Sequence, residues 1–348
     1  MRKLRIGHRM VGEGAPVFVI AEAGVNHNGK FGLAKKLVKA AKKAGADAIK
    51  FQTFSAEDVV TKDAPQAEYQ KKNTQKESQF SMLKKLELSD GEFRRIKEYC
   101  GRQKIMFLST PFSEKSADFL SSISMAAFKI SSGELTNLQF IKHVASFGEP
   151  IILSTGMATM EEVREAVRAI YLAGNRQLVL LHCTSNYPAA LKDANLKAIV
   201  ALADEFGVVV GYSDHTAGID IAPAAVAIGA KVIEKHLTLD RDMAGPDHKA
   251  SIEPHQFAQL VDSIRNVEAA LGTGKKQPMA SEKDVMRAAR RSLIAKKDIA
   301  AGSMISRAMI EIKRPGSGIK PKYLKKIVGR KIQKGVKAGE LLAWQMFR

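Results

Sequence analysis

The chain has 348 residues, of which 45% are hydrophobic and 26% charged, and its formal net charge is +19. This length and composition are typical of a soluble protein with one large domain and a smaller one. No apolar run approaches the ~20 residues of a membrane-spanning helix, residues 1–14 lack the apolar core of a signal peptide, and two cysteines cannot build a disulfide framework. We therefore predict a protein of the reducing cytoplasm with no membrane partner.

The positive charge by itself fits a nucleic-acid partner, an anionic substrate or a lysine-rich solvated surface. The lysines are spread over amphipathic segments such as 33–46, where Leu33, Leu37 and Val38 keep one face apolar. Aromatic residues make up 6% of the chain, and no basic tract is interleaved with them. The pattern favours a solvated surface and predicts no nucleic-acid partner.

Short apolar runs alternate with amphipathic stretches from residue 17 to residue 272. The predicted strands are 17–24, 47–53, 105–112, 127–134, 150–156, 178–188, 207–216 and 231–238. The helices that follow them are predicted at 31–44, 89–102, 113–121, 137–147, 159–174, 195–205, 218–228 and 254–272. A polar insertion at 55–88 separates the second strand from its helix. Capping boxes mark two helix starts, Ser89 with Glu92 and Thr159 with Glu162.

Eight strands that are apolar nearly throughout, each followed by a helix, predict a (β/α)8 TIM barrel, with a doubly wound open sheet as the alternative. In such a barrel all carboxyl ends of the strands meet on one face, where active sites lie. The polar residues predicted to converge there are Glu22, Lys50, Gln52, Thr110, Lys129, Ser132, Glu134, Ser154, Ser185 and His215, with His236 beside them.

The pattern changes after Gly272. Residues 272–288 read as a polar linker, and from residue 289 short apolar pieces are punctuated by glycines, as in "AAGSMI" and "KAGELL". We therefore predict a barrel domain at 1–271, a linker at 272–288 and a small, mostly β domain at 289–348.

Two lysines lie inside predicted apolar strands, where an unpaired charge is costly. Lys50 and Lys129 either pair with internal carboxylates or, together with Thr110, Ser132 and Ser154, form an anion site through charge-assisted hydrogen bonds. Both interpretations stay open from the residues alone.

His215 and His236 end consecutive predicted strands, so they should be neighbours and indicate a metal site. Imidazole nitrogens favour Mn²⁺, Fe²⁺, Co²⁺ or Zn²⁺ over Mg²⁺. Carboxylates of Glu22, Glu134 and Asp247 are expected near the same rim, and Glu134 is a candidate ion-pair partner of the second buried lysine.

Nine motifs together resemble the sialic acid synthase family over essentially the whole chain. Eight lie in the predicted barrel: "IAEAGVNHNG", "KFQTF", "LSTPF", "FKISSGE", "LSTGM", "GYSDHT", "IEKHLTLD" and "GPDHKASIEP". The ninth, "KRPGSGI", resembles the signature of that family's C-terminal antifreeze-like (SAF, β-clip) domain. The resemblance implies a TIM barrel followed by a SAF domain. It implies a transferase that condenses phosphoenolpyruvate, an N-acyl hexosamine and water into a nine-carbon 2-keto-3-deoxy acid and phosphate.

The resemblance also implies roles for single residues. The phosphoenolpyruvate site would be Lys50, Thr110, Lys129, Ser132, Ser154 and Ser185. The sugar site would be Gln52, Phe112, Tyr187, Asp247 and Arg314, with Glu134 nearby. The catalytic groups would be Glu22, Glu134, His215 and His236, and the two histidines would hold a divalent metal, Mn²⁺ before Mg²⁺ or Co²⁺.

Two details concern the acceptor and the phosphate contact. Neuraminate-forming members often carry asparagine where this chain has Ser185, followed here by Asn186. Segments 50–54 and 73–89 are closer to the legionaminic acid branch, which uses a 2,4-diacetamido-6-deoxy sugar in place of N-acetylmannosamine.

The family resemblance further implies a domain-swapped homodimer in which Arg314 reaches the N-acyl group in the partner's barrel. The thirteen residues 272–284 could span up to ~45 Å when extended. Two rival functions remain at this stage. One is a Schiff-base pyruvate aldolase using Lys50, Lys129 or Lys235, and the other is a non-enzymatic basic nucleic-acid-binding protein, which only the net charge suggests.

Overall fold

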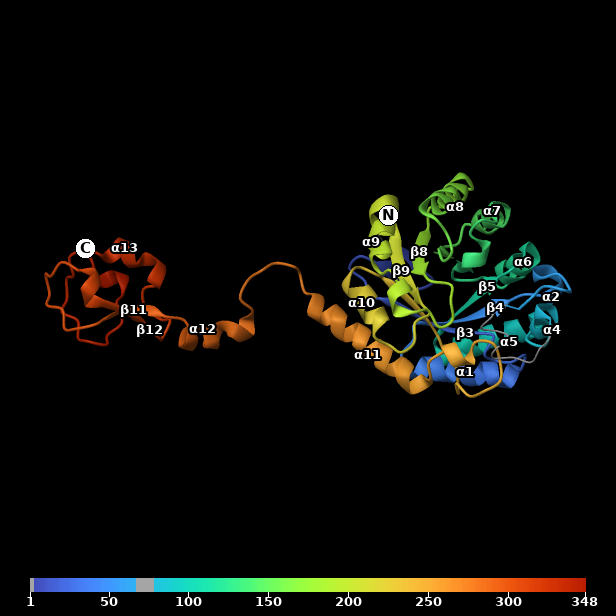
Figure 1. The fold of residues 1–348 in the computed structure, drawn as a ribbon, viewed down its shortest axis with the longest axis horizontal. Coiled ribbons are helices and arrows are strands. Elements are labelled where there is room, and N and C mark those ends of the chain that lie inside the picture. Colours follow the sequence, from blue (N-terminus) through green and yellow to red (C-terminus); the bar gives the residue numbers. More distant parts are fainter. Residues whose placement is uncertain (1–2, 67–77) are drawn as a thin grey trace. The chain divides into compact units, whose positions relative to one another are not determined.

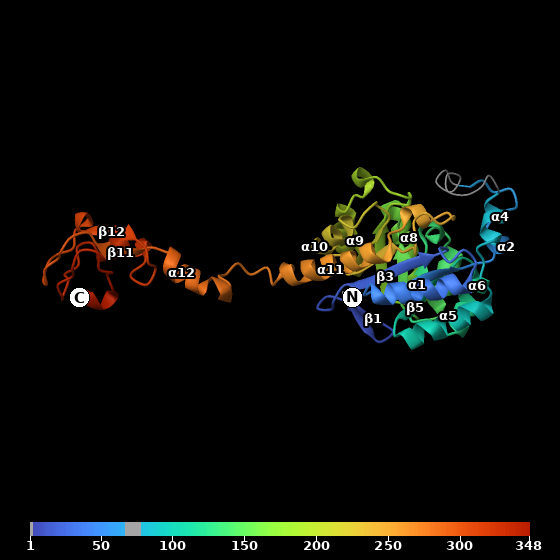
Figure 2. The same cartoon turned by 90° about the horizontal axis from the view of Figure 1, so that it is seen from below.

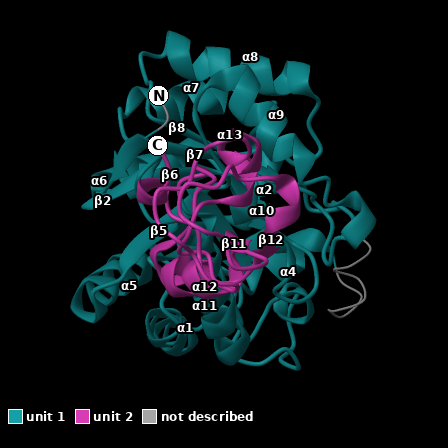
Figure 3. Ribbon diagram, turned by 90° about the vertical axis from the view of Figure 1, so that its left-hand side faces the viewer, with its two compact units in different colours: residues 1–272 teal, residues 273–348 magenta. Residues whose placement is uncertain are grey.

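The structure, a computed structural model, describes residues 3–66 and 78–348 of the chain. It divides into two compact units, residues 1–272 and residues 273–348 (Figure 3). Each unit has a hydrophobic core of its own.

Eight parallel strands of the first unit form a nearly closed barrel with the hydrogen-bonding order β5-β4-β3-β10-β9-β8-β7-β6 (Figure 1). β5 and β6 lie side by side at the seam. The strands are β3 (Phe18–Gly24), β4 (Ala48–Thr53), β5 (Met106–Pro111), β6 (Phe128–Ile130), β7 (Ile151–Ser154), β8 (Leu178–Cys183), β9 (Val209–Asp214) and β10 (Val232–His236). Nearly all of their residues are buried, because the barrel is filled inside and covered by helices outside. The predicted TIM barrel is confirmed, and the open sheet is wrong.

The helices that cover the barrel follow the predicted order, and Figure 2 shows α1 beside α5 on its outside. They are α1 (Phe31–Lys43), α5 (Asp90–Gln103), α6 (Glu114–Ser122), α7 (Leu138–Ser146), α8 (Met160–Leu172), α9 (Lys197–Phe206), α10 (Ile221–Ala227) and α11 (Pro254–Leu271). Both predicted capping boxes are present at the starts of α5 and α8. No helix of the described residues is long and apolar enough to cross a bilayer.

Two parts of the first unit do not belong to the predicted alternation of strands and helices. An antiparallel hairpin of β1 (Lys3–Ile6) and β2 (Arg9–Gly12) precedes the barrel. Its turn at Gly7, with φ of +54°, approaches the side chain of Met106 at the amino-terminal end of β5. In its described residues, the insertion after β4 contains two short helices, α2 (Ala56–Val59) and α4 (Gln79–Lys84). Residues 67–77 of the predicted insertion lie outside the described residues.

The second unit is built from short pieces around an antiparallel pair, β11 (Ser292–Ala295) and β12 (Ile310–Lys313). Its helices are α12 (Lys283–Ala289) and α13 (Leu324–Ile327). The segment 272–288 is therefore not an irregular linker throughout, since most of α12 falls within it. Short 3-10 helices complete the two units: η1 (Ser132–Glu134), η2 (Leu191–Asp193), η3 (His248–Ala250), η4 (Ala280–Glu282), η5 (Arg307–Met309), η6 (Pro321–Tyr323) and η7 (Trp344–Met346).

Candidate active site

A cavity of about 430 Å³ opens at the carboxyl ends of the barrel strands. The predicted site residues that line it are Glu22, Lys50, Gln52, Thr110, Phe112, Lys129, Ser132, Ser154, Ser185, Tyr187, His215, His236 and Asp247. They come from all eight strands or from the loops directly after them. The convergence expected from the polar strand ends is therefore present.

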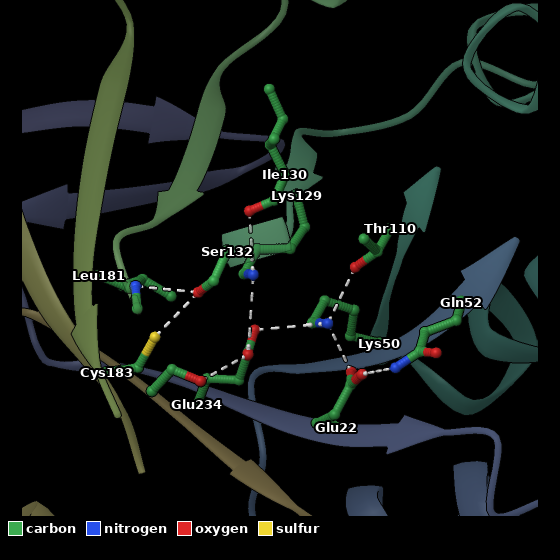
Figure 4. Close-up of polar contacts among 12 residues, drawn as sticks. Glu22, Lys50, Gln52, Thr110, Lys129, Ile130, Ser132, Leu181, Cys183 and Glu234 are labelled. Atoms are coloured by element: carbon green, nitrogen blue, oxygen red, sulfur yellow. Dashed lines mark hydrogen bonds and ion pairs between the residues drawn. The ribbon is translucent and has the colours of Figure 1, made fainter. Parts of the chain in front are cut away.

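Four charged side chains form the floor of the cavity (Figure 4). The Lys50 Nζ lies 2.7 Å from the Glu22 carboxylate and 3.6 Å from the Glu234 carboxylate, and it donates a hydrogen bond of 3.0 Å to the Thr110 hydroxyl. The Lys129 Nζ lies 4.0 Å from the other oxygen of Glu234. All four charged side chains are at most 4% exposed. The buried lysines are thus paired, and Glu234 bridges them.

This arrangement drives the pKa values of the two carboxylates in opposite directions. Burial raises the pKa of Glu22 to about 7, although Lys50 opposes the shift. Burial acts on Glu234 in the same sense, but the two lysines outweigh it and lower its pKa to about 2. For Lys129 burial prevails over the attraction of Glu234 and lowers its pKa. Near neutral pH the floor holds one firmly ionised carboxylate and one carboxyl group that readily exchanges a proton.

Small polar side chains crowd the rim above β6, β7 and β8. The Ser132 hydroxyl accepts a 3.0 Å hydrogen bond from the Gly156 N–H and lies 3.2 Å from the Cys183 sulfur. A Cβ atom at Gly156 would overlap the Ser185 hydroxyl and would lie 2.9 Å from both the Ser132 hydroxyl and the Cys183 sulfur. The Ser154 hydroxyl is buried with no hydrogen-bond partner among the described residues. The rim is a cradle of hydroxyl groups, and only a glycine at position 156 leaves the space between them open.

His215 and His236 are neighbours, as predicted, with ring centroids 5.6 Å apart. Burial lowers the pKa of His215 to about 4 and lowers that of His236 well below its usual value. Both imidazoles are therefore neutral at physiological pH. Tyr187 packs against both rings, at 4.2 Å and 5.6 Å between centroids.

The hydrogen bonds of His215 leave one of its electron pairs free. Its Nδ1 lies 2.8 Å from the Thr184 carbonyl, which can only accept, so Nδ1 carries the hydrogen and Nε2 does not. The Ser213 hydroxyl lies 3.3 Å from that Nε2, but its single hydrogen points to Glu234, 2.9 Å away. Among the described residues the Nε2 electron pair thus receives no hydrogen bond, which is the state that a metal ligand needs.

These two histidines fit a divalent metal whose remaining positions are open. The Nδ1 of His236 is buried without a hydrogen-bond partner among the described residues. No group of three or more His, Cys, Asp and Glu side chains is arranged as a metal site in the described part of the chain. Two neutral imidazoles would leave coordination positions for water or substrate oxygens, as catalytic metal sites do.

Three polar groups meet on the β3 side of the cavity. The Gln52 amide donates a 3.2 Å hydrogen bond to Glu22. An ideal Cβ atom at Gly24, which has φ of +51°, would lie within 3.6 Å of side-chain atoms of Glu22, Gln52 and Asp247. Burial raises the pKa of Asp247 to about 6. A polyol bound here would meet an amide and two carboxyl groups.

One predicted site residue of the first unit does not line the cavity. β6 ends at Ile130 and the chain turns into η1, so the 127–134 strand prediction was too long. Glu134 lies in that turn, where its carboxylate accepts a hydrogen bond from Asn137, and it does not pair with Lys129. Arg314 is exposed in the second unit, one residue after β12.

Prediction from sequence missed Glu234 and Ser213, which both line the cavity. The signal was present, because each lies two residues before a predicted metal ligand and a strand places alternate residues on one face. Lys235, considered for a Schiff base, is on the opposite face of β10. Its Nζ donates to the Asp214 carboxylate at 2.9 Å and to the Thr216 carbonyl at 2.6 Å, and both charged side chains are 0% exposed.

Comparison with known proteins adds to this geometry. Residues 37–276 match the profile of the NeuB family, and residues 290–348 match that of the SAF domain. The N,N'-diacetyllegionaminic acid synthase of Legionella pneumophila is 48% identical over 339 residues, 96% of this chain and 95% of that protein. The N,N'-diacetyllegionaminic acid synthase of Campylobacter jejuni is 46% identical over 93% of this chain and 98% of that protein.

A solved structure is similar as well. The N-acetylneuraminic acid (sialic acid) synthetase of Leptospira borgpetersenii, crystallised with citrate, superposes with a TM-score of 0.73 at 36% sequence identity. The match covers 82% of this chain and 95% of that one.

Proposed function

The chain belongs to the NeuB family and is a phosphoenolpyruvate-dependent synthase of nonulosonic acids, and we propose that its barrel cavity joins phosphoenolpyruvate to the open-chain aldehyde of an N-acyl hexosamine. The acceptor is N-acetylmannosamine or a 2,4-diacetamido-6-deoxy analogue. The observation that carries this proposal is one cavity that combines two buried lysines, a rim of hydroxyl groups and two neutral histidines. Cations and hydroxyls suit an enol phosphate, and a Lewis acid suits an aldehyde.

Phosphoenolpyruvate would bind between the floor and the rim. Lys50, Thr110 and Lys129 supply charge from below, and the serines at 132, 154 and 185 supply hydrogen bonds from the side. The unpartnered Ser154 hydroxyl and the space kept open at Gly156 support this placement of an oxyanion. Ser185 lines the cavity whereas its neighbour Asn186 does not, so Ser185 is the proposed contact.

In the reaction, carbon 3 of the enol forms a bond to the aldehyde carbon, and the aldehyde oxygen takes up a proton. Carbon 2 is left as an oxocarbenium-like centre, to which water adds, and the adduct expels phosphate. Glu22 is the proposed group that takes the proton from this water, because a carboxyl with a pKa of about 7 is matched to proton transfer at neutral pH. Gln52, Phe112, Tyr187 and Asp247 are the proposed sugar contacts.

Enzymes of this family typically depend on a metal ion. We propose Mn²⁺, with Mg²⁺ or Co²⁺ as alternatives, held by His215 and His236, where it would polarise the sugar aldehyde as a Lewis acid. The Thr184 carbonyl fixes the tautomer of His215 for this task.

A phosphate-release assay tests the proposal. The full chain with Mn²⁺ and phosphoenolpyruvate should release phosphate only when an N-acyl hexosamine is added, and one equivalent of the nine-carbon keto acid should form with it. Pyruvate as donor, or trapping of a lysine by borohydride, would instead support a Schiff-base aldolase. Phosphate release in the absence of an acceptor would refute the proposal. So would the absence of phosphate release with every acceptor tested.

We also propose a homodimer in which Arg314 completes the partner's cavity at the sugar's N-acyl group. Support comes from the exposure of Arg314 and from the separate core of its unit. The proposed location is the reducing cytoplasm, consistent with two buried cysteines that form no disulfide.

Mixed dimers test this arrangement. Arg314→Ala and His236→Ala should each be nearly inactive alone. Scrambled subunits should regain up to about a quarter of the wild-type activity, because half of the dimers are mixed and each of these has one intact composite site. If the mixtures stay inactive while control mixtures with wild type exchange subunits normally, Arg314 serves its own chain.

A further inference from the structure

The positive charge of the chain is concentrated in its small second unit. Residues 273–348 contain twenty lysines and arginines and five aspartates and glutamates, whereas the whole chain has 55 and 36 of these residues. The second unit therefore carries most of the formal net charge of +19. The function proposed above uses one of its cations, Arg314, and leaves the rest of this excess unexplained.

A second cavity, of about 540 Å³, lies within this unit. Its volume is within the usual range of small-molecule sites. Of the nine described residues that line it, six are basic and none is acidic. We call this cavity the basic pocket, and its basic residues are Lys283, Arg287, Arg290, Arg291, Lys320 and Lys322.

Close backbone packing fixes the two walls of the basic pocket. One wall is α12 with the two arginines that follow it, and the other runs from Gly316 to η6. The Gly316 N–H donates a 2.7 Å hydrogen bond to the Arg287 carbonyl, and a Cβ atom at Gly316 would lie only 2.6 Å from the Cβ of Arg290. Beside this contact, the buried Ser292 hydroxyl accepts a 2.9 Å hydrogen bond from the Gly318 N–H. The pocket is therefore a built feature of the unit.

The charges of the basic pocket have little compensation within the chain. Among the described residues, its only ion pair joins Arg287 to Asp284 at 3.7 Å, between side chains that are 79% and 93% exposed. Ion pairs as exposed as this one contribute little. The Lys322 Nζ lies over an aromatic ring, 4.9 Å from the centroid of Tyr323. Six like charges around one hollow repel one another, so an anion bound between them would relieve that repulsion.

The number and type of these cations favour a ligand with several linked phosphates. One phosphate group carries a charge of about −1.5 to −2 at neutral pH, which is far less than the pocket presents. Three of the six cations are arginines, whose guanidinium groups bind phosphate oxygens in pairs. Aromatic rings adjoin the pocket, since Lys322 contacts Tyr323 and the Tyr323 ring lies 5.4 Å from that of Trp344. Trp344 is 44% exposed, and an exposed indole is a surface on which a nucleobase can stack.

We propose that the basic pocket binds an anion with two or more linked phosphate groups, supplied either as inorganic oligophosphate or as the phosphate chain of a nucleotide. All described residues that line the barrel cavity belong to the first unit, so the basic pocket is a second site. The proposal does not depend on the reaction assigned to the barrel.

Isothermal titration calorimetry of the full chain tests the proposal, in buffer that contains a chelator so that the ligands do not compete for metal. The ligands are inorganic phosphate, tripolyphosphate, adenosine triphosphate and a short single-stranded DNA. Tripolyphosphate should bind at least roughly tenfold more tightly than inorganic phosphate, because each added hydrogen bond between charged groups is worth about a factor of ten. Its affinity should fall as salt is added.

Two double variants locate the binding site. Arg290→Gln with Lys320→Gln removes two cations of the basic pocket and should weaken tripolyphosphate binding at least roughly tenfold. Arg330→Gln with Lys334→Gln is the matched control, because it removes the same charge from two exposed residues of the same unit that do not line the pocket. The control should weaken binding by less than about threefold, since exposed charges outside the site are screened. Thermal unfolding verifies that each variant is folded, and Lys320→Gln against Lys334→Gln gives the same comparison if a double variant is not.

The ligands also distinguish the two sources of the phosphates. If the pocket is built for a nucleotide, adenosine triphosphate should bind more tightly than tripolyphosphate, and Trp344→Ala should remove the difference. Equal affinities would support the proposal with inorganic oligophosphate as the ligand.

Three results would overturn the proposal. The first is the absence of binding by both tripolyphosphate and adenosine triphosphate. The second is equal weakening by the two double variants, because the anion would then be held by the overall charge of the unit or by another site. The third is tighter binding of the DNA than of tripolyphosphate with equal losses in both double variants, which would indicate an extended nucleic-acid surface in place of a pocket.

Discussion

The buried pair of Lys235 and Asp214 offers a quantitative test of how the barrel holds its histidines. Lys235→Met keeps a side chain of similar length but removes the ammonium. The Asp214 carboxylate would then be a buried charge without its counter-ion, and the Thr216 carbonyl would lose its donor. Thr216 directly follows His215, so the same loss loosens the chain next to a proposed metal ligand.

The magnitude follows from the complete burial of both side chains. Removing one partner of a buried ion pair costs about 3–5 kcal/mol of unfolding free energy. For a domain as large as this barrel, ~2 °C of Tm corresponds to each kcal/mol, so Tm should fall by roughly 6–10 °C. Asp214→Asn keeps an oxygen for the Thr216 N–H and hydroxyl while removing the charge. The double variant with Lys235→Met should therefore recover at least about half of the loss.

Thermal unfolding followed by circular dichroism is the assay, with Lys39→Met as the control because Lys39 is exposed on α1. A drop below about 2 °C for Lys235→Met would refute the reasoning, since a buried carboxylate would then have lost its partner at almost no cost. A double variant less stable than the single one would also contradict it.

Four further outcomes are expected. Chelation should abolish turnover, and added Mn²⁺ should restore it. His236→Ala should lower kcat ~10²-fold or more, and its affinity for Mn²⁺, measured by electron paramagnetic resonance, should also fall. Lys129→Ala should raise the KM for phosphoenolpyruvate far more than that for the sugar, and Asp247→Ala should do the reverse; equal effects would contradict the division of the site. Gly156→Ala should raise the KM for phosphoenolpyruvate about tenfold, because its methyl group enters the hydroxyl cradle. Because the pKa of Glu22 is raised from 4.5 to about 7, the folded state binds the extra proton, and this contribution to stability is lost as pH rises from about 4.5 to 7. The free energy of unfolding of Glu22→Gln, measured in urea across that range, should lack this loss. A difference in unfolding free energy between variant and wild type that stays constant with pH would argue against the shift.

The barrel could be predicted from sequence because its signals are local. Each strand is a short apolar run followed by an amphipathic helix, and the parallel arrangement then forces the polar strand ends together. The same logic placed His215 beside His236, which the structure confirms. The hairpin of β1 and β2 was missed because its strands are four residues each and carry exposed charges.

The electrostatics of the floor could not be read from the chain. Whether Lys129 pairs with Glu134 or Glu234 depends on where β6 ends, and a strand boundary is set by the packing of its neighbours. Glu234 lies more than one hundred residues from Lys129 in sequence, and only the closure of the barrel brings them within 4.0 Å.

The alternation of residues along β10 limits how this site can be redesigned or transferred to another barrel. Three consecutive residues alternate between two tasks, with Glu234 and His236 in the cavity and Lys235 bonded outside it. Inserting or deleting one residue in β10 would exchange the two faces, placing an ammonium among the reactants and a carboxylate in the apolar shell. A graft that copies only the cavity residues would omit the outer pair. The transferable unit is therefore β9 and β10 together, with Asp214, Lys235 and their register intact.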